Sequence, residues 1–260
     1  MEVILFKMNI MPCPFDFTNK TILLTGAALG IGKQSAIQLH QAGANLILLD
    51  KDKLAVKGLA DDLGSNVRHF FVDMADIGSL QSLIEEILSE AGPLDGFVNC
   101  VGVRSRRPLN MIKPEETQEI MNVNFGAFIE LVRIITKKGH FKPGLSIVSV
   151  SSIASVRGGA GVTLYAASKA AVDASVRCLA KELSTKTIRL NTVMPSQIDT
   201  PEYQRLMEMN GDKADPILAR QYLGLGEPMD VANLILFLLS PFSKFISGAS
   251  LPADGGFLTS

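Results

Sequence analysis

The feature that most constrains this chain is a glycine-rich segment, residues 25–32, which lies between two apolar stretches. A short apolar run, 20–24, precedes it, and a run with helical spacing, 31–42, follows it. Glycines let a backbone turn tightly and approach a pyrophosphate closely, and the N–H groups that begin a helix hold phosphate charge. The order of strand, glycine turn and helix therefore predicts a dinucleotide-binding loop.

The glycines of this segment are spaced G-x-x-x-G-x-G, at Gly26, Gly30 and Gly32. The standard dinucleotide motif is G-x-G-x-x-G, so the spacing matches it only in part. A glycine turn that merely caps a structural helix would leave the same local pattern. Further features of the chain have to separate these two interpretations.

The composition is typical of a folded domain with a sizeable core. The 260 residues are 47% hydrophobic and 20% charged, a length that fits one large α/β domain or two small ones. A formal net charge of −1 gives no electrostatic argument for a nucleic acid or an acidic membrane, and tryptophan is absent. We therefore expect a small-molecule substrate, with neither nucleic acid nor membrane as a partner.

Cysteine and histidine are sparse and scattered. An odd number of widely spaced cysteines argues against a disulfide framework or a zinc site, and favours a reduced, cytoplasmic setting. The isolated histidines are expected near the surface rather than as ligands or bases. These residues are Cys13, Cys100, Cys178, His40, His69 and His140.

Residues 1–17 precede the first expected strand, and we expect an N-terminal extension packed on a single NAD(P)-binding domain that spans 18–260. The apolar stretch 3–6 is too short for the h-region of a signal peptide, and no basic region precedes it. No uninterrupted apolar run reaches the roughly 18 residues that a membrane span needs. A start at Met8 or Met11 is the alternative interpretation.

Short apolar runs alternate with helical patterns along most of the chain. Continuous apolar strands between helices predict a parallel sheet covered on both faces. We therefore expect an α/β fold, a single Rossmann-like, doubly wound domain with a seven-stranded parallel sheet flanked by helices. The expected strands are 21–25, 45–50, 67–73, 96–101, 146–151, 189–194 and 249–252, and the expected helices are 31–42, 53–63, 79–91, 114–138, 164–184 and 228–239.

One long irregular region, 197–225, interrupts this alternation. It is polar, contains Pro201, Gly211 and Pro216, and follows the end of an expected strand. Open α/β sheets bind ligands at the carboxyl ends of their strands. The region is therefore a candidate for a movable substrate lid, and a long surface insertion is the alternative.

Polar residues and a glycine stand at the ends of three expected strands. An acid in the place of Asp50 accepts hydrogen bonds from the adenosine ribose and repels a 2′-phosphate, which favours NAD, although Lys51 could soften that exclusion. Asp50 could instead cap the following helix. Asp73 could accept from the adenine amino group or simply form a turn. Asn99 can connect neighbouring strands, and Gly102 lets the backbone approach a cofactor.

The most informative polar residues occur later in the chain. Tyr165 and Lys169 are four residues apart at the start of a strong helical pattern, so they face the same way. An ammonium group near a phenol stabilises the phenolate, which makes a tyrosine usable as an acid or base near neutral pH. Ser152 ends the fifth strand, where its hydroxyl could hold the same substrate oxygen. Asn124 is a poor helix former inside a helical pattern, which invites a functional reason.

With these residues in this order, the chain resembles the short-chain dehydrogenase/reductase family over residues 18–257. The family pattern T-G-x-x-x-G-x-G matches 25–32, and the D-G-G segment near the family's C-terminus resembles 253–257. The family's catalytic asparagine, serine, tyrosine and lysine match Asn124, Ser152, Tyr165 and Lys169.

This resemblance implies NAD as the cofactor, with NADP possible, bound across the C-terminal edge of the sheet, and no metal. It implies that Ser152 holds the substrate oxygen, that Tyr165 exchanges a proton with it, that Lys169 supports the phenolate and the ribose hydroxyls, and that Asn124 positions a water. The implied cofactor contacts are Gly26, Gly30, Ile31, Gly32, Asp50, Asp73, Met74, Asn99, Gly102, Tyr165, Lys169, Ile198 and Thr200.

The chain departs from the family pattern at two places. The usual N-N-A-G is Asn99-Cys100-Val101-Gly102 here, and Val101 adds bulk near the cofactor. The usual P-G after the sixth strand is Pro195-Ser196, and by the resemblance Ser196 lines the nicotinamide side. We expect this serine to alter the fit of the cofactor or the substrate.

The expected reaction is hydride transfer between NAD and a secondary alcohol or ketone. Its pocket is expected from 103–107, 153–161, Gln197 and the segment 203–209, much of which is apolar. NADPH-dependent reduction of 3-oxoacyl groups on acyl carrier protein is the alternative, which the acid at Asp50 disfavours. Sugars, polyols and steroids remain open as substrates.

The loop after the fourth strand carries a basic cluster of Arg104, Arg106 and Arg107. It could meet an anionic substrate or carrier, and a solvated loop is the other interpretation. A sugar-nucleotide epimerase of the related extended group would have a T-G-x-x-G-x-x-G loop and a longer chain. A cofactor-binding regulator without turnover would not need the complete catalytic set. By the resemblance we expect a homotetramer or a homodimer.

Overall fold

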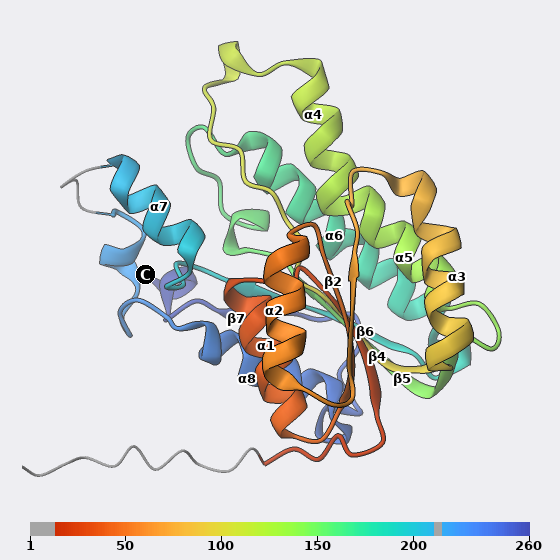
Figure 1. Cartoon of the computed structure of the whole chain (residues 1–260). Coiled ribbons are helices and arrows are strands. Elements are labelled where there is room, and N and C mark those ends of the chain that lie inside the picture. Colours follow the sequence, from red (N-terminus) through yellow and green to blue (C-terminus); the bar gives the residue numbers. More distant parts are fainter. Residues whose placement is uncertain (1–13, 211–214) are drawn as a thin grey trace, which may run out of the picture.

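The computed structural model describes residues 14–210 and 215–260, and it contains one seven-stranded parallel sheet. The strand order is β3-β2-β1-β4-β5-β6-β7, which confirms the expected doubly wound α/β fold (Figure 1). The strands are β1 Thr21–Thr25, β2 Asn45–Asp50, β3 Val67–Phe71, β4 Leu94–Asn99, β5 Phe141–Val150, β6 Arg189–Pro195 and β7 Ser250–Ala253.

Helices cover both faces of the sheet, and each face has its own apolar core (Figure 1). Leu39 of α1, Val56 of α2 and Ile235 of α8 are fully buried in one core. Leu131 of α5 and Val176 of α6 are fully buried in the other, together with residues of α3. The helices are α1 Gly30–Gln41, α2 Lys53–Leu63, α3 Leu80–Ala91, α4 Pro114–Met121, α5 Ala127–Ile135, α6 Thr163–Glu182, α7 Pro201–Asn210 and α8 Pro228–Leu239.

The strand order reverses at β1, and this reversal determines where a ligand can bind. The chain runs from β1 outward through β2 to β3, then returns to add β4 on the other side of β1. Connections leaving β1 and β4 therefore diverge, which opens a crevice at the carboxyl ends of these two strands. The glycine-rich segment 25–32 lies at this crevice.

The expected long helix over 114–138 is confirmed as one uninterrupted helical segment as far as Ile135, but a π-helical turn lies inside it. α4 ends at Met121, a π-helical turn covers Asn122–Gly126, and α5 follows. A π turn adds a residue to the helical repeat and is common at functional sites. Asn124 lies in this turn, which explains an asparagine inside a helical pattern.

The expected irregular region 197–225 contains a helix, α7, that the sequence pattern did not indicate. Pro201 is its first residue, and proline is favourable at the first helical position although it breaks a helix interior. The Thr200 hydroxyl accepts a hydrogen bond from the Tyr203 N–H at 3.2 Å, which caps the first turn. α7 stands apart from the two helix layers of the sheet (Figure 1).

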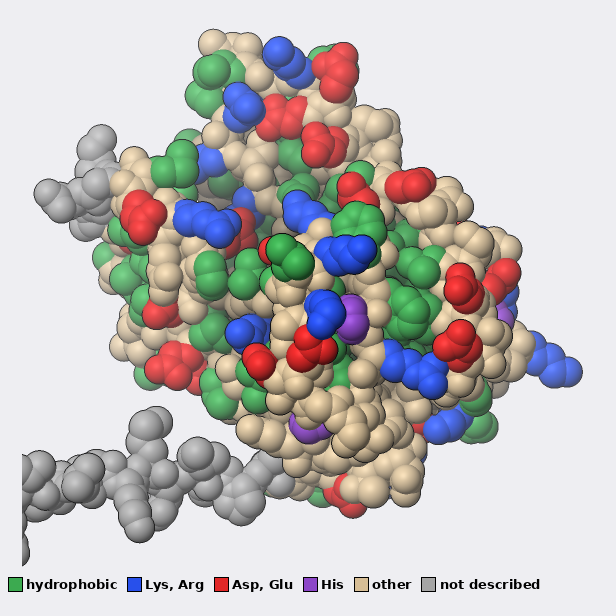
Figure 2. All heavy atoms as spheres, in the orientation of Figure 1, with side chains coloured by type: hydrophobic (Ala, Val, Ile, Leu, Met, Phe, Trp, Pro, Cys, Tyr) green, Lys and Arg blue, Asp and Glu red, His purple; other side chains and the backbone are tan. Residues whose placement is uncertain are grey.

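The described part of the N-terminal segment packs against the body. Phe17 is buried, and the rings of Phe15 and Phe242 have their centroids 6.0 Å apart. Residues 1–13 of the expected extension lie outside the described residues. No helix among the described residues has the length and apolar character needed to span a membrane. Basic and acidic side chains are interspersed on the face shown in Figure 2.

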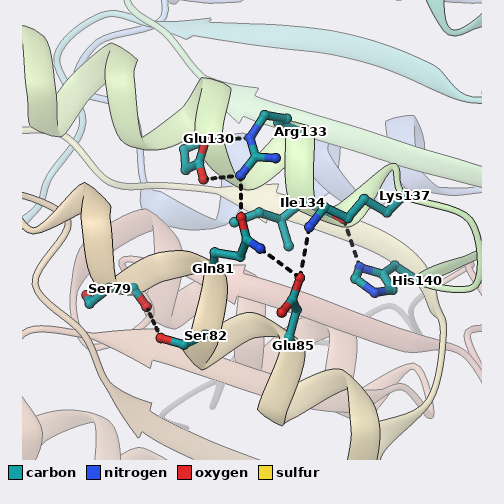
Figure 3. Close-up of polar contacts among 9 residues, drawn as sticks. All are labelled: Ser79, Gln81, Ser82, Glu85, Glu130, Arg133, Ile134, Lys137 and His140. Carbon is teal, nitrogen blue, oxygen red and sulfur yellow. Dashed lines mark hydrogen bonds and ion pairs between the residues drawn. The ribbon is translucent and has the colours of Figure 1, made fainter.

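Exposed charged side chains connect α3 with α5 (Figure 3). Arg133 donates hydrogen bonds to Glu130 and, across the helix pair, to Gln81 at 2.8 Å. Lys137 donates to Glu85 at 2.8 Å. Exposed pairs of this kind contribute little individually. The two helices are held mainly by their buried apolar faces.

A half-buried carboxylate, Asp95, connects the beginnings of three strands. It accepts hydrogen bonds from Lys20 at 3.1 Å, from the Thr21 N–H at 3.0 Å and from Lys142 at 2.6 Å. Burial acts to raise the pKa of Asp95, but these hydrogen bonds outweigh it and hold the pKa below its usual range. The ionised form therefore stabilises the fold.

We predict that Asp95→Asn lowers the free energy of unfolding by about 1–3 kcal/mol at pH 7, because the amide lacks the negative charge and turns an NH2 donor toward one set of donors that the carboxylate accepts from. The lowered pKa means that the wild-type advantage is present above the unfolded value of about 3.9 and is lost as the pH falls below it. Urea unfolding of both proteins at pH 7, pH 4 and pH 3 measures this, and the difference between them should shrink at pH 3. An equal difference between the two proteins at pH 7, pH 4 and pH 3 would contradict it.

Candidate active site

A cavity of about 460 Å³ lies at the carboxyl ends of β1, β4, β5 and β6, beside α7. Its wall combines backbone of the glycine-rich segment with polar side chains from distant parts of the chain. The lining residues are Leu29, Gly30, Ile31, Gly32, Cys100, Gly102, Val103, Arg104, Val150, Ser151, Ser152, Tyr165, Lys169, Pro195, Ser196, Gln197, Ile198, Thr200, Pro201, Glu202 and Arg205.

The glycines of segment 25–32 are required by close backbone contacts. Gly26 and Gly30 have φ angles of +69° and +53°, in the left-handed region that favours glycine. A Cβ on Gly32 would lie 1.9 Å from the Gly26 carbonyl oxygen, and one on Gly26 would lie 2.9 Å from the carbonyl carbon of Cys100. The glycine spacing therefore follows from the way this loop packs, independently of any ligand.

The N-terminus of α1, which begins in this loop, is open to an anion. In the described structure, Leu29 at its N-cap makes no side-chain capping hydrogen bond, and the first turn carries no acidic residue. The N–H groups of a first helical turn need acceptors, and the helix dipole favours negative charge there. Gly30, Ile31 and Gly32 of this turn line the cavity, so an anion bound there can meet these donors.

Asp50 lies at the end of β2, next to the glycine loop. Its carboxylate accepts hydrogen bonds from the Ala28 N–H and the Asp52 N–H, each at 2.9 Å. Asp52, not Asp50, is the N-cap of α2 and accepts from the Ala55 N–H at 3.0 Å. The alternative in which Asp50 caps that helix is therefore wrong. Asp50 does not line the cavity itself.

Four other expected cofactor contacts, Gly26, Asp73, Met74 and Asn99, lie outside the cavity lining. Asp73 accepts from the Ala75 N–H at 2.9 Å, which is the turn interpretation, and borders a separate hollow between β3 and α3. The side chain of Met74 is buried in the core. Buried Asn99 accepts from the Thr25 hydroxyl and donates to Ser149, so it connects β1, β4 and β5.

Asn124 is buried, and its amide makes three hydrogen bonds to neighbouring groups. Its Oδ1 accepts from the Val103 N–H at 2.7 Å, and its Nδ2 donates to the Val103 carbonyl at 3.0 Å and to the Ser168 hydroxyl at 2.9 Å. Asn124 is absent from the cavity lining. It holds the loop after β4 against α6, which carries the next group of site residues.

Tyr165 and Lys169 lie on one face of α6, and both line the cavity with Ser152. The Lys169 ammonium is 6.0 Å from the centroid of the Tyr165 ring. Lys169 is buried and donates to the Val150 carbonyl at 2.8 Å. The Ser152 hydroxyl accepts from the Ala154 N–H at 3.1 Å. A hydroxyl, a phenol and an ammonium group thus face one space, which suits proton exchange with a substrate oxygen.

Residues at the two departures from the family pattern also line the cavity. Burial raises the pKa of the Cys100 thiol to about 12 despite the nearby Lys169 ammonium, so the thiol is protonated at neutral pH. The Ser196 hydroxyl is buried and has no hydrogen-bond partner among the described residues. Val101 is not part of the lining.

Sequence reasoning missed Glu202 as a cavity residue, and it included Arg205 only as an unnamed member of the expected segment 203–209. Both belong to α7, three residues apart, and that spacing was visible only once the segment was known to be helical. Of the expected apolar pocket residues, Met209 is 85% exposed, so its side chain faces away from the wall. Among the described residues no cluster of acidic, histidine or cysteine side chains is placed to hold a metal ion.

Comparison with known proteins gives consistent matches over nearly the whole chain. The family model described as Enoyl-(Acyl carrier protein) reductase matches residues 26–258. A 3-oxoacyl-[acyl-carrier-protein] reductase of Thermotoga maritima is 34% identical over 243 residues, covering 92% of this chain and 98% of that protein.

Two solved structures from Brucella melitensis have the same fold. A short-chain dehydrogenase/reductase called glucose/ribitol dehydrogenase has a TM-score of 0.87 and 29% identity, covering 94% of this chain and 98% of its own. A 3-ketoacyl-(acyl-carrier-protein) reductase complexed with NADH has a TM-score of 0.83 and 26% identity, covering 93% and 99%.

We predict that Gly32→Ala weakens binding of NADH by about 10- to 100-fold, because the added methyl group collides with the Gly26 carbonyl oxygen and displaces the loop. Gly58→Ala is the matched control, since nothing lies within 4 Å of its added Cβ in α2. It should leave binding unchanged and raise the free energy of unfolding by about 0.5–1 kcal/mol. Fluorescence titration and urea unfolding measure both. Equal NADH affinity in Gly32→Ala and wild type would refute this account of the loop.

Proposed function

Since this chain belongs to the short-chain dehydrogenase/reductase family and is an NAD(P)-dependent oxidoreductase acting on CH–OH groups, we propose that it uses NAD with a secondary alcohol or ketone. The observation that carries the proposal is the meeting of Ser152, Tyr165 and Lys169 with the glycine loop in one cavity. Cofactor loop and proton-transfer groups come from opposite halves of the chain. They share a space only in the folded protein.

The residues present fit a dinucleotide. Backbone contacts at Gly26 and Gly32 leave no room for side chains, and the uncapped N-terminus of α1 offers N–H donors to a pyrophosphate. A Cβ on Gly102 would lie 2.8 Å from the Lys169 ammonium, so the backbone there approaches closely. The unpartnered Ser196 hydroxyl offers a further polar contact on the cavity wall. When bound, the nicotinamide ring accepts or supplies the hydride.

Asp50 is the basis for proposing NAD rather than NADP. Its carboxylate lies beside the glycine loop, held by two backbone N–H groups through one lone pair on each oxygen. The remaining lone pairs can accept from ribose hydroxyls, whereas a 2′-phosphate would meet like charge. Lys51 follows Asp50 in the sequence, and its positive charge could reduce this repulsion.

Each polar residue of the cavity has a separate proposed task. Tyr165 donates a proton to the substrate oxygen in reduction and removes one in oxidation, and Ser152 hydrogen-bonds the same oxygen. Lys169 favours the phenolate electrostatically and reaches the ribose hydroxyls. Asn124 acts at a distance from the substrate, by fixing the loop that ends at Val103. A water that it positions remains a prediction from the resemblance.

Reduction of 3-oxoacyl groups carried by acyl carrier protein is the second candidate. The Thermotoga maritima relative and the Brucella melitensis structure carry that name. We further propose a cytoplasmic setting, and a homotetramer or homodimer because α6 presents the small residues Ala167 and Ala174 on exposed surface.

We predict that Tyr165→Phe lowers turnover by about 10²- to 10⁴-fold while NADH binds within about threefold of wild type, because only the phenol oxygen is removed. Tyr222→Phe is the matched control, since its side chain is 66% exposed and lies outside the cavity lining. Stopped-flow absorbance with a ketone panel measures turnover, and fluorescence titration measures binding. Near-normal turnover in Tyr165→Phe would overturn the assignment.

A further inference from the structure

The substrate end of the cavity carries an excess of positive charge. Four charged side chains line the cavity: Lys169, Arg104, Glu202 and Arg205. Lys169 lies deep, donating to backbone carbonyls, and has its proposed task at the cofactor. The other three lie on the loop after β4 and on α7. Two guanidinium groups and one carboxylate therefore leave a net charge of +1 where a substrate would enter.

Arg104 lies close to one of the reacting groups. Its guanidinium carbon lies 5.5 Å from the centroid of the Tyr165 ring, within the range of a cation–π contact. Because Arg104 and Tyr165 both line the cavity, a substrate whose oxygen reaches the Tyr165 hydroxyl can bring a second group to this cation. The backbone before Arg104 is fixed, because the Asn124 amide hydrogen-bonds to both the N–H and the carbonyl of Val103.

The contact of Arg104 with the protein's own acid is weak. Its Nε is 3.9 Å from the Glu202 carboxylate, and the two side chains are 36% and 56% exposed. Ion pairs of this length and exposure contribute little and are easily exchanged. A carboxylate that lies in the plane of the guanidinium group can accept two parallel hydrogen bonds from it, which is a stronger arrangement than this long contact with Glu202.

Position in the structure separates Arg104 from the other arginines of the basic cluster. Neither Arg106 nor Arg107 lines the cavity, and Arg107 donates to Glu116 at 3.0 Å on the outer surface. Both are exposed. The solvated-loop interpretation therefore fits these two residues, whereas the anionic-substrate interpretation fits Arg104.

We propose that the substrate of this site is a short hydroxy acid or its oxo acid, whose carboxylate binds Arg104 while its reacting oxygen meets Tyr165. This inference rests on the proposed function and narrows it to one substrate class. In the oxidative direction the carbinol C–H and O–H bonds break and a C=O bond forms. The hydride pair leaves to NAD⁺, the proton leaves to the Tyr165 oxygen, and the carboxylate is unchanged.

The test compares acids with their neutral esters. Wild type, Arg104→Met, Arg104→Lys and Arg106→Met are assayed with NAD and with 2- and 3-hydroxybutanoate or their methyl esters. We expect wild type to prefer the acid, and Arg104→Met to lose about 100-fold in kcat/KM for the acid but less than about threefold for the ester. Arg104→Lys should recover part of this loss, and Arg106→Met should match wild type.

The outcomes separate this inference from the proposed function. Equal use of acid and ester by wild type, or equal losses for both in Arg104→Met, would overturn the carboxylate assignment and leave the oxidoreductase function standing. If neither the acid nor the ester is turned over, calorimetry measures whether butanoate binds to the NADH complex of each protein. Binding by wild type that Arg104→Met lacks supports the inference, and no binding by wild type overturns it.

Discussion

The close approach of three backbone segments, at Gly26, Gly32 and Cys100, is the constraint on which the rest of the site depends. No side chain fits between the start of α1 and the end of β1, or between that turn and the segment after β4. The uncapped first turn of α1 therefore opens directly into the cavity. Because the strand order reverses at β1, the same turn lies at the one crevice where connections diverge.

Buried amide and ammonium groups transmit this geometry to the proton-transfer residues. Asn99 connects β1 with β4 and β5, and Asn124 connects the loop after β4 to α6. Lys169 then joins α6 to the end of β5 through the Val150 carbonyl. A buried polar group that lost one of these partners would carry a desolvation penalty, so each contact favours a single arrangement. Tyr165 is thereby set opposite the glycine loop.

Most of the fold follows from local signals, whereas parts of the site do not. The strands over 21–25 and 45–50 have the expected bounds, because each is a continuous apolar run directly flanked by residues that favour turns. The π turn Asn122–Gly126 continues the helical spacing around it, so periodicity alone cannot mark it. In the sequence, Pro201 indicates the interruption of a helix, whereas in the structure it is the first residue of α7. Which arginine of the basic cluster enters the cavity depends on packing between distant elements, and only the structure distinguishes Arg104.

The central claim is that the glycine loop and Tyr165 act together in hydride transfer with NAD. The most direct measurement follows deuterium from the 4-position of labelled NADH, or of labelled NADPH, into the alcohol formed from a 2- or 3-oxo acid. We predict one deuterium at the carbinol carbon with NADH, and much slower labelling with NADPH because of Asp50. The account would be contradicted if the protein bound NADH but neither labelled cofactor transferred deuterium to a carbonyl compound.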